Sequence, residues 1–384
     1  MSEAPPFRPR RLHPVNREHL DALAGDLGIL QHALGSRPDP THGYCVDDVA
    51  RALEVDLLHA RVLPWTAVRD SAWRSLLFLE AAFAGPRGRL RNFRTIDGTW
   101  DSEPASGDSQ GRAMLALAEA AASAPDPELA ARATALFDRA LPGATRLTSP
   151  RAQASLILAC AAAPNAARNA VMNRMATELH VRFRTFARPG WPWPESTLTY
   201  ENAVIPRAMI VAGQTLGATT MVAIGLQVLD WLLEVQTGAR GRLSPIGNSW
   251  WAYRGVRPRF DQQPIEATAL LLAAEAALSA TGKAEYRDAM ERAYGWFLGA
   301  NDSSVPVADP ARGACRDGLT PDGVNVNEGA ESTLMWLIAV EHIRAARSAA
   351  AGAAPERAAR QPSIRRDRES RSASAAGLSS GAPS

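Results

Sequence analysis

The sequence lacks the features that mark several classes of protein. Its 384 residues hold Lys+Arg 42 against Asp+Glu 40, so there is no basic excess of the kind that binds nucleic-acid phosphates. The sequence has no run of about 18 apolar residues, so no membrane-spanning helix is predicted. The first residues lack the apolar core of a signal peptide. Only three cysteines are present, Cys45, Cys160 and Cys315, which is typical of a reducing compartment. We therefore expect a cytoplasmic protein with no nucleic-acid partner and no membrane partner.

The charge is uneven along the chain and separates the tails from the body. Residues 1–19 carry four arginines against two acidic residues, and residues 348–384 carry six against three, which leaves the body mildly acidic. The segment 348–384 is rich in Ala, Ser, Gly and Arg and has too few large aliphatic residues to bury a core, so it is predicted to be disordered. The expected organisation is an N-terminal extension (1–15), one catalytic domain (16–347) and this tail.

Apolar residues three and four positions apart recur through the body, which is the period of an amphipathic helix. No run with a period of two is longer than four residues, so strands are not expected. Pro and Gly divide the body into twelve predicted helices, at 16–34, 45–60, 66–84, 108–123, 127–140, 150–163, 166–187, 201–216, 219–236, 264–280, 283–299 and 328–347. The sequence predicts an all-α protein.

The loops between these helices alternate in length. Those after even-numbered helices are short and carry simple caps, whereas long polar loops lead into four even-numbered helices, at 85–107, 188–200, 237–263 and 300–327. Hairpins that cannot bury their faces alone must stack on one another. Six hairpins with tight turns at one end and long loops at the other predict an (α/α)6 toroid. Its even-numbered helices form the inner ring, and its long loops gather at one mouth.

Polar residues are concentrated where the even-numbered helices begin. Acidic residues and Asn are ordinary helix caps, so any single one of them is explained by capping. Five odd-numbered helices begin with a single capping residue, whereas five of the six even-numbered helices begin with several polar residues; the single caps are Asn16, Thr66, Asp126, Asn165 and Thr219. The sixth helix, entered by Ser149, Pro150 and Arg151, is the exception because it has no carboxylate. The excess predicts a functional site at the mouth.

Tryptophan is unusually frequent, with Trp 10 against Phe 9 and Tyr 5. Half of the tryptophans fall in the mouth loops, at positions Trp100, Trp191, Trp193, Trp250 and Trp251. Flat aromatic faces beside Asp, Glu, Asn and Gln suit a ligand with apolar faces and a hydroxylated rim, such as a sugar. The alternative is that these side chains brace the long loops.

The stretch from Gly28 to Ala33 and the string HGYCVDDVARAL from His42 to Leu53 resemble a bacterial group within the six-hairpin glycosidase superfamily. Members of this group often accompany sugar-processing genes and are frequently labelled glycosyltransferase-associated. The resemblance covers most of residues 16–347. It implies the toroid fold, activity on carbohydrate and a functional link to a glycosyltransferase, but it transfers no catalytic residues.

The leading hypothesis is an enzyme that cleaves a glycosidic bond of an oligosaccharide or glycoside. Such chemistry needs a protonated carboxyl group and a second carboxylate. Glu201 or Asp261 is the predicted proton donor, because the aromatic neighbours Tyr200 and Phe260 would raise a carboxyl pKa. The candidate catalytic residues are Asp48, Asp108, Glu201, Asp261 and Glu331. The candidate sugar contacts are His42, Tyr44, Asp47, Arg112, Trp191, Trp193, Gln262, Gln263 and Asn325. In a phosphorolytic variant, Arg112 or Arg254 would bind phosphate.

Three other functions are compatible with such a toroid. A sugar epimerase would use histidines, but only His42 is expected at the mouth. A prenyl or terpene enzyme needs an aspartate-rich run, which Asp47 and Asp48 do not continue. A non-catalytic carbohydrate-binding partner of a glycosyltransferase is the third. A zinc site formed by His42, Cys45 and Cys315 is conceivable, but buried apolar roles are more usual for lone cysteines. The sequence therefore predicts no metal and no cofactor.

Overall fold

The structure is a computed structural model and describes residues 12–84 and 90–360. The chain divides into two compact units, residues 1–344 and 345–384. Helix α12 (Ala330–Arg360) begins in the first unit and forms the described part of the second. It continues past residue 347, where we expected the last helix to end. The first eleven residues of the predicted extension and the tail after residue 360 lie outside the described residues.

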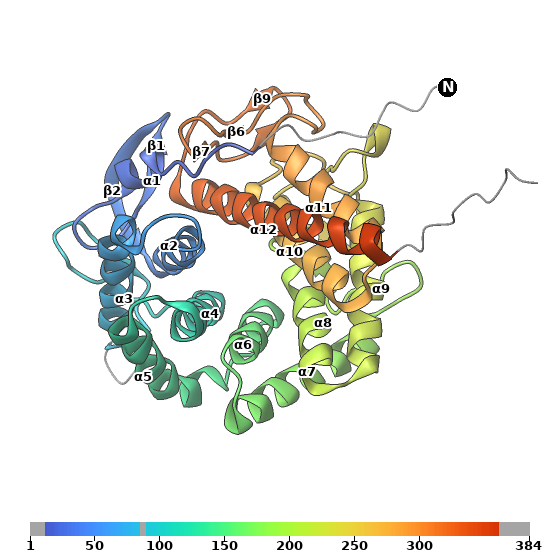
Figure 1. Ribbon diagram of the computed structural model, residues 1–384, viewed down its shortest axis with the longest axis horizontal. Coiled ribbons are helices and arrows are strands. Elements are labelled where there is room, and N and C mark those ends of the chain that lie inside the picture. The colour runs from blue at the N-terminus through green and yellow to red at the C-terminus, as the bar shows by residue number, and fades with distance from the viewer. Residues whose placement is uncertain (1–11, 85–89, 361–384) are drawn as a thin grey trace, which may run out of the picture. The chain divides into compact units, whose positions relative to one another are not determined.

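The first unit is a ring of inner helices surrounded by outer helices (Figure 1). The inner helices are α2 (Val46–His59), α4 (Gly107–Ser123), α6 (Pro150–Ala162), α8 (Val204–Leu216), α10 (Pro264–Thr281) and the start of α12. The outer helices are α3 (Arg69–Phe83), α5 (Pro127–Ala144), α7 (Ala166–Phe186), α9 (Thr219–Val235) and α11 (Ala284–Phe297). Each inner helix from α2 to α8 packs against the next even-numbered one. The predicted (α/α)6 toroid is confirmed.

Helix α12 closes the ring through contacts with helices at both sides. On one side, the Thr268 hydroxyl of α10 donates to the Met335 carbonyl oxygen at 2.9 Å. On the other side, a terminal guanidinium nitrogen of Arg51 on α2 lies 3.1 Å from a carboxylate oxygen of Glu331. The beginning and the end of the ring therefore meet at the N-termini of α2 and α12.

Inner and outer helices differ in the way their sequences bury apolar surface. Helix α10 is buried on nearly every face over its first three turns, as expected for a helix enclosed by others. Outer helix α5 buries only one stripe, made of Leu129, Ala133, Leu136 and Phe137. Positions three, four and seven apart lie on one helix face, so this stripe faces the ring and the opposite face meets solvent.

The alternation of loop lengths is also confirmed. Only Gly217 and Ala218 separate α8 from α9, and Gly217 takes a left-handed conformation with φ of 67° that closes the helix end. In contrast, residues 187–203, 236–263 and 298–329 lead into α8, α10 and α12. The N-termini of the inner helices consequently share one end of the ring with the long loops.

The prediction of a helix over 16–34 is wrong. Helix α1 (Glu18–Leu23) ends early, and a hairpin of β1 (Leu30–Leu34) and β2 (Arg37–Cys45) follows. A Cβ atom on Gly25 would lie 2.3 Å from the Tyr44 hydroxyl oxygen, so glycine is needed where the chain turns across that ring. Burial along β1 and β2 does not alternate, which is why a search for a period of two found no strand there.

Short strands organise the remaining long loops. β3 (Phe93–Arg94) pairs with β2, so that Cys45 faces Phe93 across the ladder at the start of α2. The other pairs are β4 (Thr197–Leu198) with β5 (Trp251–Ala252), β6 (Ala308–Asp309) with β7 (Ala314–Cys315), and β8 (Leu319–Thr320) with β9 (Gly323–Val324). Among the described residues, no helix is long and apolar enough to cross a membrane.

Candidate active site

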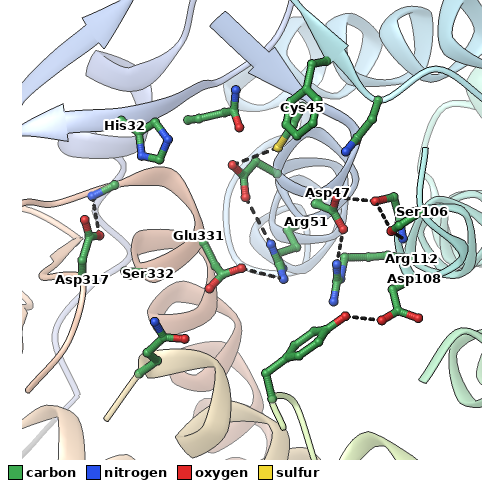
Figure 2. Close-up of a pocket in the computed structure, with 18 residues that line it drawn as sticks. His32, Cys45, Asp47, Arg51, Ser106, Asp108, Arg112, Asp317, Glu331 and Ser332 are labelled. Atoms are coloured by element: carbon green, nitrogen blue, oxygen red, sulfur yellow. Dashed lines mark hydrogen bonds and ion pairs between the residues drawn. The ribbon is translucent and has the colours of Figure 1, made fainter. Parts of the chain in front are cut away.

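A cavity of about 510 Å³ lies at the loop end of the ring, where α2, α4 and α12 begin. Its walls also include β1, β3 and the loop before α8. Figure 2 shows acidic and basic side chains from these elements pointing toward one another across the cavity. Five carboxylates and two guanidinium groups line it, belonging to Asp47, Asp48, Asp108, Asp317, Glu331, Arg51 and Arg112. The cavity is therefore polar and has more acidic than basic groups.

Arg112, one turn into α4, joins two of the predicted acidic residues. Its guanidinium donates to a carboxylate oxygen of Asp47 on α2 and to one of Glu201, which precedes α8. The Ser109 hydroxyl donates to the second Asp47 oxygen at 2.7 Å. Burial alone would raise the pKa of Asp47, but the guanidinium groups of Arg112 and Arg51 outweigh it and lower that pKa. Asp47 is thus held as a carboxylate.

Asp48 has the opposite electrostatic environment although it is the next residue. Its side chain is buried, accepts from the Cys45 thiol at 3.2 Å, and accepts from Arg51 at 3.1 Å. The pKa of Asp48 is raised to about 6, mainly by burial and also by the nearby Glu331 carboxylate, against the opposing effect of Arg51. The same Arg51 guanidinium binds Glu331, so Asp48 and Glu331 lie on either side of one cation.

Asp108, in the first turn of α4, is held by two hydroxyl groups. Ser149, which precedes α6, donates to one carboxylate oxygen at 2.6 Å, and the Tyr200 phenol donates to the other. Burial, followed by the Asp108 contact, raises the pKa of Tyr200 well above its ordinary value. Tyr200 therefore stays protonated as a donor.

A histidine lines the cavity at a position the sequence did not predict. His32 lies on β1, on the same side of the view as Asp317 in Figure 2, and its ring meets that of His42 edge-on at 4.7 Å between centroids. The expectation that only His42 lies at the mouth is wrong, because His32 was assigned to a helix that is a hairpin in the structure. On this side, burial raises the pKa of Asp317, although the Gly329 amide donates to its carboxylate at 2.8 Å.

Two of the predicted tryptophan contacts, Trp191 and Trp193, are buried away from the cavity. Trp191 is 3% exposed and packs edge-on against Trp231 and Trp251, at 5.4 and 5.2 Å between centroids. The indole N–H of Trp193, which is fully buried, donates to the Thr197 carbonyl oxygen. These rings brace the loops before α8 and α10.

The other predicted site residues fall into three groups: one lines the cavity, two are buried in the surrounding structure, and the rest are exposed outside the cavity. Gln263 lines the cavity beside the residues already described. Gln262 is fully buried and accepts from the Trp296 indole N–H at 2.9 Å. Tyr44 is buried over Gly25 and Gly28. Exposed positions outside the cavity lining are occupied by His42, Asp261 and Asn325.

Several cavity residues were not among the predicted site residues. Arg51 follows Asp47 and Asp48 by four and three positions, a spacing at which side chains meet on a helix, so this signal was present in the sequence. Ser109 lies three positions before Arg112 and could have been found in the same way. His32 gave no such signal, since its position depends on the hairpin.

No group of three His, Cys, Asp or Glu side chains within residues 12–84 and 90–360 could hold a metal ion. Cys45 and Cys315 are both buried, and burial raises the pKa of each thiol. The thiols stay protonated, and Cys45 acts as a hydrogen-bond donor to Asp48.

No protein-family model matches the sequence, and no curated protein matches it. Several solved structures match the chain in fold. A sugar epimerase from a ruminal bacterium superposes with a TM-score of 0.64 at 11% identity, over 84% of this chain and 94% of that one. A D-mannose isomerase gives 0.63 at 10% identity, over 86% and 96%. An α-1,6-mannanase of Salegentibacter gives 0.57 at 11% identity, over 85% and 95%. At such identities the likeness shows the fold alone.

Proposed function

We propose that this protein is a carbohydrate-active enzyme that cleaves a glycosidic bond, with Asp48 as the general acid. The observation that carries the proposal is the environment of Asp48. This carboxyl group lines the cavity, and burial raises its pKa to about 6. A carboxyl group whose pKa is raised toward neutral pH can act as the acid that protonates a leaving oxygen.

Glu331 is the proposed general base. Its side chain is 44% exposed, so water reaches it, and it shares the Arg51 guanidinium with Asp48. In the proposed hydrolysis, Asp48 gives its proton to the glycosidic oxygen as the bond to the anomeric carbon breaks. Glu331 takes a proton from the water that attacks this carbon. Arg51 holds both carboxyl groups in place.

This assignment replaces Glu201 and Asp261 as expected proton donors. Glu201 is bound by the guanidinium of Arg112 rather than set against an apolar wall, and it is not part of the cavity lining. Asp261 is exposed and does not line the cavity. Asp108, with its two hydroxyl donors, is proposed to accept a substrate hydroxyl.

The charge of the cavity favours a neutral sugar and water over phosphate. Acidic groups outnumber the two arginines, and Arg112 is already bound to Asp47 and Glu201. Arg254 is exposed and lies over the ring of Tyr253. A cavity of about 510 Å³ is in the range that encloses a small molecule, which fits one or two sugar rings.

The comparison with the mannanase gives further support. That structure, in complex with α-1,6-mannotetrose, is described as an inactive variant in which two adjacent aspartates are replaced by alanine. The present chain has adjacent aspartates, Asp47 and Asp48, at the start of α2 and in the cavity wall.

A second candidate function is epimerisation or isomerisation of a free sugar. His32 in the cavity wall favours it, because an imidazole can both remove and return a proton near neutral pH. The epimerase and the isomerase with the same fold point in the same direction. Hydrolysis ranks first because the buried part of the cavity carries carboxyl groups, whereas His32 lies exposed on its rim.

The test is a panel of oligosaccharides and free sugars, incubated with and without phosphate and analysed for products. Release of a shorter sugar without phosphate is expected. Sugar phosphates would indicate phosphorolysis, and interconversion of free sugars would overturn the hydrolase in favour of the epimerase. With a substrate identified, Asp48→Asn is expected to lower kcat by about 10²- to 10⁴-fold.

The matched control is Asp56→Asn. Asp56 also lies on α2 and is fully buried, and burial raises its pKa to about 6 too, but it pairs with Arg17 outside the cavity. Asp56→Asn should therefore lower stability with kcat unchanged. Equal kcat in wild type and Asp48→Asn would remove Asp48 as the acid.

A further inference from the structure

Helix α6 is the one inner helix whose start supplies no carboxylate, and the structure gives its first turn another task. Arg151 is 5% exposed and does not line the cavity. Its guanidinium donates to the Tyr200 carbonyl oxygen, and to Glu195 and Asn202 side-chain oxygens at 3.0 Å each. The guanidinium also lies over the Tyr200 ring, 5.1 Å from its centroid. One side chain therefore fixes the segment before α8 at several points.

This segment carries one residue of the cavity wall, Tyr200, and one residue that binds a side chain of the wall, Glu201. The Tyr200 phenol donates to Asp108, and the Glu201 carboxylate accepts from Arg112. Both contacts cross from the loop before α8 to α4, so they depend on where that loop is held.

The backbone of the segment would not hold this position unaided. Glu201 has φ of 46°, in the left-handed region that residues other than glycine seldom adopt. Such a conformation persists when surrounding contacts enforce it. Asn202 is fully buried and donates to a Glu266 carboxylate oxygen at 3.1 Å, so Arg151 and Asn202 anchor the chain on both sides of Glu201.

We propose that Arg151 is a positioning residue for the cavity, which acts by holding Tyr200 against Asp108 and Glu201 against Arg112. The catalytic consequence rests on the proposed function, whereas the positional claim does not. A planar guanidinium is needed because it serves three acceptors and a ring face together, which an ammonium group does not.

Arg168 provides a matched control. It is 6% exposed and donates to an Asp138 carboxylate oxygen at 2.7 Å and to the Ala163 carbonyl oxygen at 2.8 Å. Its guanidinium lies over the Phe137 ring at 4.5 Å. It makes the same kinds of contact as Arg151, but between α5 and α7, away from the cavity.

The first measurement needs no substrate. The five tyrosines are replaced by 3-fluorotyrosine, and the ¹⁹F NMR line of Tyr200 is assigned with Tyr200→Phe. This line is expected to shift in Arg151→Met, in Arg151→Lys and in Asp108→Asn, and to stay in place in Arg168→Met. An unchanged Tyr200 line in both folded Arg151 variants would overturn the proposal.

The second measurement uses whichever sugar the panel identifies. Arg151→Lys is expected to lower kcat by about 100-fold with little change in KM, because reacting groups are displaced while the cavity remains. Arg168→Lys should lose similar stability with kcat unchanged. Equal kcat in the two lysine variants would overturn the positioning role. A panel without product would count against the proposed function alone, since the ¹⁹F experiment decides the position of Tyr200.

Discussion

Two regions of the loop end look alike in sequence and differ in the structure. One is the cavity formed at the starts of α2, α4 and α12, and the other is the tryptophan cluster of Trp191, Trp193, Trp231 and Trp251. Both combine aromatic and polar residues in or near long loops. In the first region, charged side chains bind one another across open space. In the second, indole rings pack together, and the N–H groups of Trp191, Trp193 and Trp251 donate to backbone carbonyl oxygens of their own loops.

The difference shows that aromatic residues in a long loop are not by themselves a sign of a sugar site. A loop of the length of residues 236–263 needs apolar anchors of its own, because it has little regular secondary structure to hold it in place. Tryptophan supplies a large apolar surface together with one hydrogen-bond donor. Charged residues at helix starts that exceed what capping needs were the better guide to the cavity.

The largest expected effect is a loss of stability on substitution of a tryptophan in the cluster, without an effect on the cavity. Trp193→Ala should lower the free energy of unfolding by about 3–5 kcal/mol, because it empties a fully buried site. KM for a confirmed substrate should be unchanged in the protein that remains folded. Urea denaturation and steady-state kinetics check both quantities. A raised KM with normal stability would place the ring in sugar binding and break the comparison.

The second prediction concerns pH and the cavity. Burial raises the pKa of Asp48 to about 6 from 3.8. Between these values the native state holds a proton that the unfolded state has lost. The contribution of Asp48 to the free energy of unfolding is therefore fully present below about pH 4 and is lost as pH rises through about 6. The loss amounts to up to about 3 kcal/mol. Stability of Asp48→Asn relative to wild type, measured in urea at pH 4 to 7, should therefore rise with pH. A flat difference would contradict it.

A third prediction compares two tyrosine–aspartate pairs. Tyr200→Phe should cost about 1.5–3 kcal/mol of stability, since the hydrogen bond to the Asp108 carboxylate is lost. Tyr286→Phe, which removes a 2.9 Å bond to Asp230 outside the cavity, should cost a similar amount. Only Tyr200→Phe should lower turnover. Thermal unfolding and steady-state kinetics of both variants check this prediction. Equal turnover in the two variants would contradict it and would place Tyr200 outside the functional site.

The smallest effect is expected for Trp250→Ala. This ring is 58% exposed, and exposed substitutions usually change stability by less than about 0.5 kcal/mol. The urea midpoint should stay near that of wild type. A large loss of stability would mean that Trp250 belongs to the tryptophan cluster. Unchanged stability with weaker sugar binding would mean that Trp250 contacts the sugar.

Helix periodicity and loop length predicted most of the fold, because both follow from local properties of the chain. The apolar period predicted inner and outer helices, and the alternation of short and long loops predicted which end carries the site. The hairpin of β1 and β2 was missed, since it depends on the close approach of Tyr44 to Gly25 and Gly28 rather than on an alternating pattern. His32 was missed with it.

The sequence by itself determined that polar side chains would gather at the starts of the inner helices, because a helix start and a long loop are local features. It placed Asp47, Asp48, Asp108, Arg112, Gln263 and Glu331 in one region, and the structure has them in the cavity wall.

Only the tertiary structure decided their chemistry. Asp47 and Asp48 are adjacent and chemically identical, yet the pKa of the first is lowered by Arg112 and Arg51 and that of the second is raised by burial. The tertiary structure likewise put Trp191 and Trp193 in a packed cluster. The physical reason is that a pKa and an exposed surface depend on which distant segments surround a side chain, and this is set when the ring closes.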